Sequence, residues 1–302
     1  MAPFHAFRMR PSYDVLLRGS PALPFGLYHL QLATAEQLCR LHYKPGMLTT
    51  VKARLKELTD HHFTQADAVG AKHVGDRITF SARYYYTLGQ EGVRYLQRCG
   101  LDTHEAWRAT KEIDKHALFV DHTLEVNDLL ISAALVGQVD SQYHVETFVH
   151  DRVLKRNPFE VKLAGRTFRL VPDAYVVFYQ TFDGGSQRRL PVFLEHDRDT
   201  EGQTFFRHRI RAYIALLKSD VIQQRFGVGT ITVAFTTFTH HKRLEEMRAW
   251  TLAELDASHE TRHLGEAFLF DLLPPAPPPA TAWFGSHWYL AYQDQQRSTL
   301  LS

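Results

Sequence analysis

Apolar and polar positions in the first third of the chain follow the period of a helix. Val51, Leu55 and Leu58 recur every three to four residues, which places them on one helical face. The preceding residues 44–46 read Lys-Pro-Gly and predict a tight turn, and Thr49 is expected to cap the helix. Short helices separated by such a turn predict a helix-turn-helix.

The segments around this helix extend the prediction. Thr34 and Gln37 have the spacing of a capping box at the start of the preceding helix. A polar segment at residues 60–76 leads into a strand-like run at 77–88, and another helix is expected at 91–99. This order predicts a winged helix-turn-helix, a fold that commonly binds DNA.

The rest of the chain changes from paired strands to strands that alternate with helices. That order predicts an α/β (α+β) fold in which helices cover a mixed sheet. The longest apolar helix is expected at residues 117–136. The strands are expected at 143–150, at 167–179, in the run 191–194 that leads to Glu195, at 230–238 and at 267–272, and the later helices at 203–218 and 241–255.

Length and composition favour two folded domains. A chain of 302 residues with 44% hydrophobic content can bury more than one core. We expect an irregular segment at 1–24, a winged-helix DNA-binding domain at 25–102, an α/β domain at 103–273 and a Pro-rich, aromatic tail at 274–302.

Charge and cysteine content limit the class of protein. The net charge of +2 excludes a uniformly basic surface, so any DNA-binding face is local. Cys39 and Cys99 form no metal-binding motif, which favours a reducing compartment. Because no apolar run is long enough to cross a membrane and no signal peptide is evident, we expect a cytoplasmic protein without a membrane partner.

Cations and hydroxyls on the predicted recognition helix are candidate DNA contacts. Thr49, Lys52 and Lys56 lie away from the apolar face, and Thr50 and Arg54 flank it. These side chains suit phosphates and base edges of double-stranded DNA. The alternative is an ordinary solvated helix face, because Lys and Arg lie on the outside of most helices. The candidates are Thr49, Thr50, Lys52, Arg54 and Lys56 on the helix, and Arg77 and Arg83 in the wing.

Three acids in the second half of the chain predict a metal site. Asp173 follows Pro172 within the predicted strand 167–179, and Glu195 and Asp197 stand two residues apart at the end of the next strand. Residues i and i+2 of a strand point to one face. Clustered carboxylates repel each other, and a divalent cation with oxygen ligands removes that repulsion. We therefore expect Mg²⁺ or Mn²⁺ as the cofactor.

The long apolar helix also carries polar groups. His122, Glu125 and Asn127 would be costly to bury there unless they face a site or pair with one another. An exposed polar stripe is the alternative interpretation.

In the order of its elements, the chain resembles the PD-(D/E)XK nuclease core, and with the winged helix it resembles the replication-relaxation family of plasmid and mobile-element proteins. The resemblance covers residues 25–272. It rests on residues 88–96, His122 with Asn127-Asp128, Pro172-Asp173-Ala174, the stretch 193–200, Arg209 and Tyr213.

The resemblance implies roles for individual residues. Asp173 and Glu195 would be metal ligands, Glu125 a third acid, and Asp197 a ligand or a group that orients one. The nuclease superfamily has lysine where this chain has Asp197. Arg209 is the best substitute for its charge, with Arg198 and Arg207 as competitors.

Two functions follow from these expectations. The first is a DNA-binding protein of plasmid or mobile-element replication or mobilisation that nicks one strand at a metal site. The second is a non-catalytic DNA-binding regulator or replication accessory with a degenerate nuclease fold. Replication or mobilisation proteins are further candidate partners. A third interpretation is a structural acidic cluster neutralised by Arg198 and Arg209.

Overall fold

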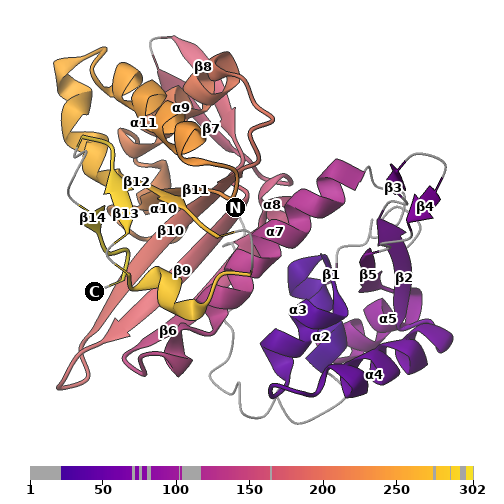
Figure 1. Cartoon of the computed structure of the whole chain (residues 1–302). Coiled ribbons are helices and arrows are strands. Elements are labelled where there is room, and N and C mark those ends of the chain that lie inside the picture. The colour runs from indigo at the N-terminus through magenta and orange to yellow at the C-terminus, as the bar shows by residue number, and fades with distance from the viewer. Residues whose placement is uncertain are drawn as a thin grey trace. The chain divides into compact units, whose positions relative to one another are not determined.

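The protein forms two compact units (Figure 1). The computed structural model describes residues 22–69, 72–74, 77–79, 83–101, 103, 117–163, 165–274, 277–285, 287–292 and 297–301. One unit spans Arg10–Ile131, and the other spans Ser132–Ser302 together with Met1–Met9. Most of the irregular segment expected at 1–24 and parts of the expected wing lie outside the described residues.

The N-terminal unit combines short helices with small antiparallel sheets. One sheet has the strand order β1-β5-β2, and β3 pairs with β4 in a hairpin. Its elements are α2 (Ala22–Leu30), β1 (Leu32–Ala33), α3 (Ala35–His42), α4 (Leu48–Asp60), β2 (Thr64–Val69), β3 (Lys72–Val74), β4 (Arg77–Thr79), β5 (Arg83–Leu88), α5 (Gln90–Arg98) and most of α7 (Ala117–Ala134).

Local sequence signals place the first helices of this unit. The capping box at Thr34 and Gln37 is confirmed, because each side chain accepts the other residue's backbone N–H at 3.1 Å. Val51 and Leu55 are fully buried, as predicted for one helical face. The cap predicted at Thr49 is wrong. The Met47 carbonyl accepts the N–H of Val51, so Met47 is the N-cap. Thr49 therefore lies within the first turn of α4.

The C-terminal unit is built on a seven-stranded mixed sheet with the order β14-β13-β12-β11-β10-β9-β6. β11 runs parallel to β10 and to β12, and the other neighbours pair antiparallel. This arrangement confirms the predicted mixed sheet with helices of an α+β fold. The strands are β6 (Tyr143–His150), β9 (Ala174–Thr181), β10 (Gln187–Asp197), β11 (Thr232–Thr237), β12 (Phe268–Leu272), β13 (Trp288–Leu290) and β14 (Arg297–Ser298).

Most of the helical segments of this unit pack against one face of the sheet (Figure 1). The predicted apolar residues Phe206, Ile210 and Tyr213 of α9 are fully buried in a core shared with Phe193 and Phe235 of β10 and β11. The helical segments of the unit are η1 (Val136–Gln138), α8 (Asp151–Leu154), α9 (Gln203–Leu217), α10 (Val221–Phe226), α11 (His241–Leu255), η2 (His259–Ala267) and η3 (Ala280–Trp283). None of the helices in the described part of the chain has the length and apolar character needed to cross a membrane.

The single strand predicted at residues 167–179 is wrong. The segment divides into β8 (Arg166–Leu170), which forms its own hairpin with β7 (Phe159–Leu163), and β9, which joins the large sheet. Pro172 lies between them and has no N–H to donate to a strand partner. Asp173 therefore lies in the bend just before β9 and not inside a strand.

The hairpin predicted between β9 and β10 is confirmed. Residues Thr181 and Gln187 form the last pair, and Gly184 and Gly185 in the turn have φ values of 91° and 81°. Only glycine adopts such values without strain. The aromatic part of the tail belongs to the same sheet, because β13 pairs with β12 and β14.

Candidate functional site

The end of β10 brings two acids to one face of the sheet. Glu195 contacts Arg209 of α9, and Asp197 contacts Arg243 of α11. Both helices lie on the same side, so the shared face predicted for the two acids is confirmed. His196, between them, bonds the hydroxyl of Thr236 on β11 at 3.0 Å.

Asp173 lies beside Glu195. Ala174 of β9 pairs with Leu194 of β10, which brings the residues before β9 next to the end of β10. The backbone N–H of His196 donates to Asp173 Oδ2 at 2.8 Å. The strand register therefore unites two of the three predicted metal ligands.

Glu195 is a buried acid in a polar cage. It is 2% exposed, the hydroxyl of Tyr213 donates to its Oε1, and Arg209 donates to its Oε2 at 3.1 Å. Burial raises the pKa of Glu195 to about 8, and the charge of Asp173 adds to the rise against the opposing effect of Arg209. The carboxylate form of Glu195 therefore lacks enough positive charge around it.

Arg209 joins Glu195 to a second acid. Its other terminal nitrogen donates to Glu201, which lies in the loop between β10 and α9. Burial acts to lower the pKa of Arg209, but Glu195 and Glu201 outweigh it and the pKa is raised. Arg209 is thus a permanent cation in contact with Glu195 and Glu201, and its role as a substitute for the lysine of the nuclease pattern stays a prediction.

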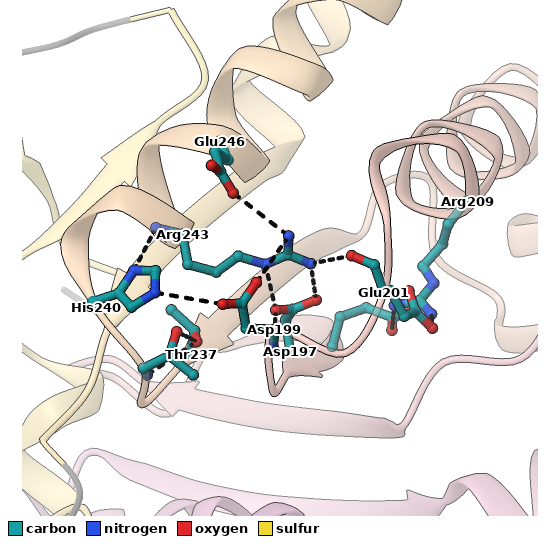
Figure 2. Close-up of polar contacts among 10 residues, drawn as sticks. Asp197, Asp199, Glu201, Arg209, Thr237, His240, Arg243 and Glu246 are labelled. Carbon is teal, nitrogen blue, oxygen red and sulfur yellow. Dashed lines mark hydrogen bonds and ion pairs between the residues drawn. The ribbon is translucent and has the colours of Figure 1, made fainter.

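Asp197 forms a buried ion pair (Figure 2). Nε and a terminal nitrogen of Arg243 donate to its two oxygens, both at 2.7 Å, and the pair is almost fully buried. The same guanidinium donates to the Glu201 carbonyl at 2.8 Å and lies 5.0 Å from the ring centre of Trp250. Both oxygens of Asp197 are therefore engaged by a protein cation.

Asp173 and Glu195 fit a divalent cation better than the full predicted set of ligands does. Within the described residues, no three or more His, Cys, Asp or Glu side chains are arranged to hold a metal ion. Mg²⁺ is commonly held by only one or two carboxylates, and water and substrate phosphate complete its shell. Glu195, which is costly to ionise, would gain the positive charge it lacks.

The polar residues of α7 lie in the N-terminal unit. Asn127 is fully buried and donates to the carbonyls of Leu30 at 3.0 Å and Leu32 at 2.6 Å. His122 and Glu125 are half-buried on the same helix. Asn127 thus fixes the segment between α2 and β1, and a site role for Glu125 or His122 stays a prediction.

Replacing Asn127 by alanine should lower the free energy of unfolding by about 1–3 kcal/mol, because two buried carbonyls lose their donor. Urea unfolding followed by circular dichroism measures the change. The exposed Asn157 is the matched control, and its alanine variant should remain close to wild type. Equal effects of the two variants would contradict the structural role of Asn127.

The predicted DNA-contacting residues of α4 are displayed on its surface. Thr49, Thr50, Lys52 and Lys56 are exposed, and Arg54 is half-buried. The cations pair with acids of their own unit, as in Lys52 with Glu36 at 2.9 Å, Arg54 with Glu57 at 2.7 Å and Lys56 with Asp60 at 3.1 Å. Arg77 begins β4 and Arg83 begins β5, and their side chains lie outside the described part.

Sequence reasoning missed Glu201 and Arg243. Arg243 lies in the first turn of α11, where a cation opposes the helix dipole. A cation in this unfavourable position indicates an acidic partner elsewhere in the fold. The competing cations Arg198 and Arg207 have other positions, since Arg198 is half-buried just after β10 and Arg207 pairs with Glu254 at 2.5 Å.

Comparison with known proteins gives one match. The family model for replication-relaxation proteins matches residues 26–232, which is more than half of the chain. Searches of curated proteins and of solved structures give no significant match. The matched region contains α4, Asp173 with Glu195, and Arg209. By this match, the chain belongs to the replication-relaxation family.

Proposed function

We propose that this protein binds duplex DNA through its N-terminal unit and nicks one strand at Asp173 and Glu195 with Mg²⁺ or Mn²⁺. The family indicates a part in plasmid or mobile-element replication. The observation that carries the proposal is the meeting of Asp173 and Glu195 at the ends of paired strands, with Arg209 donating to Glu195 at 3.1 Å.

The order of elements supports a PD-(D/E)XK nuclease-like assignment. β6, β9 and β10 pair antiparallel, α9 crosses over, and β11 then pairs parallel to β10. Asp173 stands just before β9, and Glu195 stands near the end of β10. Since fold alone does not determine activity, the proposal rests on these groups and not on topology.

Each group has a distinct part in the proposed reaction. Asp173 and Glu195 supply oxygen ligands to the cation. The cation, when bound, supplies positive charge for the phosphate and activates water. Arg209 donates to the phosphate but cannot act as a base near neutral pH. Tyr213 donates to Glu195, and burial together with the charge of that acid keeps the pKa of Tyr213 well above its ordinary value.

The N-terminal unit supports DNA recognition by a winged helix. α4 follows the tight turn at Gly46, whose φ is 87°, and the β3–β4 hairpin lies in the wing position of the sequence. Lys52 and Lys56 are exposed on α4 and suit phosphates.

Replacing Lys52 and Lys56 together by alanine should weaken duplex binding and reduce its salt dependence. Each phosphate contact contributes roughly 0.9 to the slope of log affinity against log salt, so the slope should fall by about 2. Fluorescence anisotropy at several salt concentrations measures it. The control is Arg94→Ala, which removes another exposed, ion-paired cation of the same unit. An unchanged slope in the double variant would show that Lys52 and Lys56 of α4 do not contact DNA phosphates.

Conversion of supercoiled plasmid to open circles tests the nicking reaction. The plasmid should carry the candidate origin, and purified protein should be assayed with Mn²⁺ and with a chelator. Nicking only in the presence of Mn²⁺ supports the proposal. Intact plasmid together with normal duplex binding would contradict it.

A specific observation favours a second candidate function. Asp197 and Glu195 are both engaged by arginines, so the acids of the sheet already have protein partners. A non-catalytic DNA-binding regulator or replication accessory would have this arrangement as a structural feature. It predicts duplex binding without nicking under any metal condition.

A further inference from the structure

Arg209 holds two acids at once. One terminal nitrogen donates to Glu195 Oε2 at 3.1 Å, and the other donates to Glu201. The Arg209 side chain is 24% exposed, whereas that of Glu195 is 2% exposed. Arg209 is therefore partly accessible to solvent, whereas the acid that it contacts is buried.

Hydrogen bonds hold the backbone of the loop that carries Glu201 (Figure 2). The buried Arg243 donates to the Glu201 carbonyl at 2.8 Å and to Asp197. The N–H of Asp199 donates to Asp197 Oδ1 at 2.7 Å, and Asp199 has the left-handed φ of 59° that these contacts hold in place. The loop that carries Glu201 is thereby fixed to the end of β10.

We propose that Glu201 and Arg209 form a latch on Glu195. In the DNA-free protein Arg209 binds the Glu195 carboxylate, and a DNA phosphate competes for Arg209 and so frees Glu195 to bind the divalent cation. Glu201 is the positioning residue of this latch. The inference deepens the proposed function and rests on its metal site.

Competition for the same oxygens is the physical basis of the latch. A cation at Glu195 would lie close to the Arg209 guanidinium, and the two positive charges repel. A phosphate presents a bidentate acceptor to arginine and stands in for both carboxylates. Because coupling between two ligands is reciprocal, DNA that releases Arg209 raises metal affinity by the factor by which metal raises DNA affinity.

Calorimetric titration with Mn²⁺, with and without a short DNA duplex, tests the latch. For the wild type, DNA should tighten Mn²⁺ binding by roughly 5- to 150-fold, the usual range of such coupling. Asp173→Asn, titrated in the same way, gives the Mn²⁺ taken up by DNA itself. Arg209→Gln should bind Mn²⁺ more tightly than wild type without DNA, and DNA should add little.

Arg211→Gln is the matched control. Arg211 lies on the same helix, pairs with Glu254 at 2.7 Å and carries the same charge, but does not contact Glu195. Comparison with Arg211→Gln separates the effect of losing the latch from the effect of losing one positive charge. Glu201→Gln should also tighten Mn²⁺ binding without DNA, although removal of a negative charge by itself would weaken it.

Two results would overturn the latch in different ways. If wild type binds Mn²⁺ equally well with and without DNA, and Arg209→Gln resembles Arg211→Gln, the latch is wrong and the metal site stands. If neither wild type nor any variant takes up Mn²⁺ beyond the Asp173→Asn baseline, the metal site is wrong and the latch falls with it.

Discussion

Asp173→Asn is expected to reduce Mn²⁺-dependent nicking by more than about 100-fold while duplex binding stays unchanged. Groups that only orient a metal ligand typically contribute roughly 10- to 100-fold, so loss of a ligand should exceed that range. The asparagine retains an oxygen that can accept the His196 N–H, a bond of 2.8 Å in the wild type. The variant therefore removes charge from the site and leaves the local backbone contact in place.

Plasmid conversion rates and duplex anisotropy measure the two properties separately. Asp183→Asn is the control, since Asp183 is an exposed acid in the turn between β9 and β10. It should nick at the wild-type rate. Nicking by Asp173→Asn within a few-fold of wild type would exclude Asp173 as a metal ligand.

Arg243→Met should lower the free energy of unfolding of the C-terminal unit by about 3–5 kcal/mol, because it leaves Asp197 as a buried charge without its partner. Both side chains are no more than 3% exposed, so water cannot replace the lost contact without local rearrangement. The loss is large compared with the total stability of a typical domain.

Urea unfolding followed by tryptophan fluorescence measures this loss, since Trp250, Trp283 and Trp288 all belong to the C-terminal unit. The double variant Arg243→Met with Asp197→Leu removes both charges and should recover part of the stability. Lys242→Met, next to Arg243 on α11 with an 82% exposed side chain, should change stability little. A double variant no more stable than Arg243→Met would show that the ion pair is not the source of the loss.

The pair of Asp197 and Arg243 also bears on the proposed nuclease-like assignment. At the position where the proposed nuclease-like assignment implies lysine, this chain has Asp197, which binds Arg243 of α11. A positive charge is thus still present next to β10, but it serves to fix the loop before α9. Arg209, on α9, is the cation that contacts Glu195.

Much of the fold follows from local pattern. The capping box at Thr34, the buried face of Val51 and Leu55, α11 and the hairpin between β9 and β10 are all readable in short windows, because caps, helical periodicity and turn glycines act over a few residues. The common face of Glu195 and Asp197 follows equally from the two-residue period of a strand.

The sequence by itself thus determined the order of the main helices and strands, the common face of Glu195 and Asp197 on β10, and the placement of Arg209 on the helix that follows. The tertiary structure alone decided that Asp173 stands outside its strand, that Asp197 binds Arg243 and that Glu201 holds Arg209. The physical reason is that a carboxylate selects its partner by distance and burial. Asp197 and Arg243 lie 46 positions apart in the sequence, and no local window contains both.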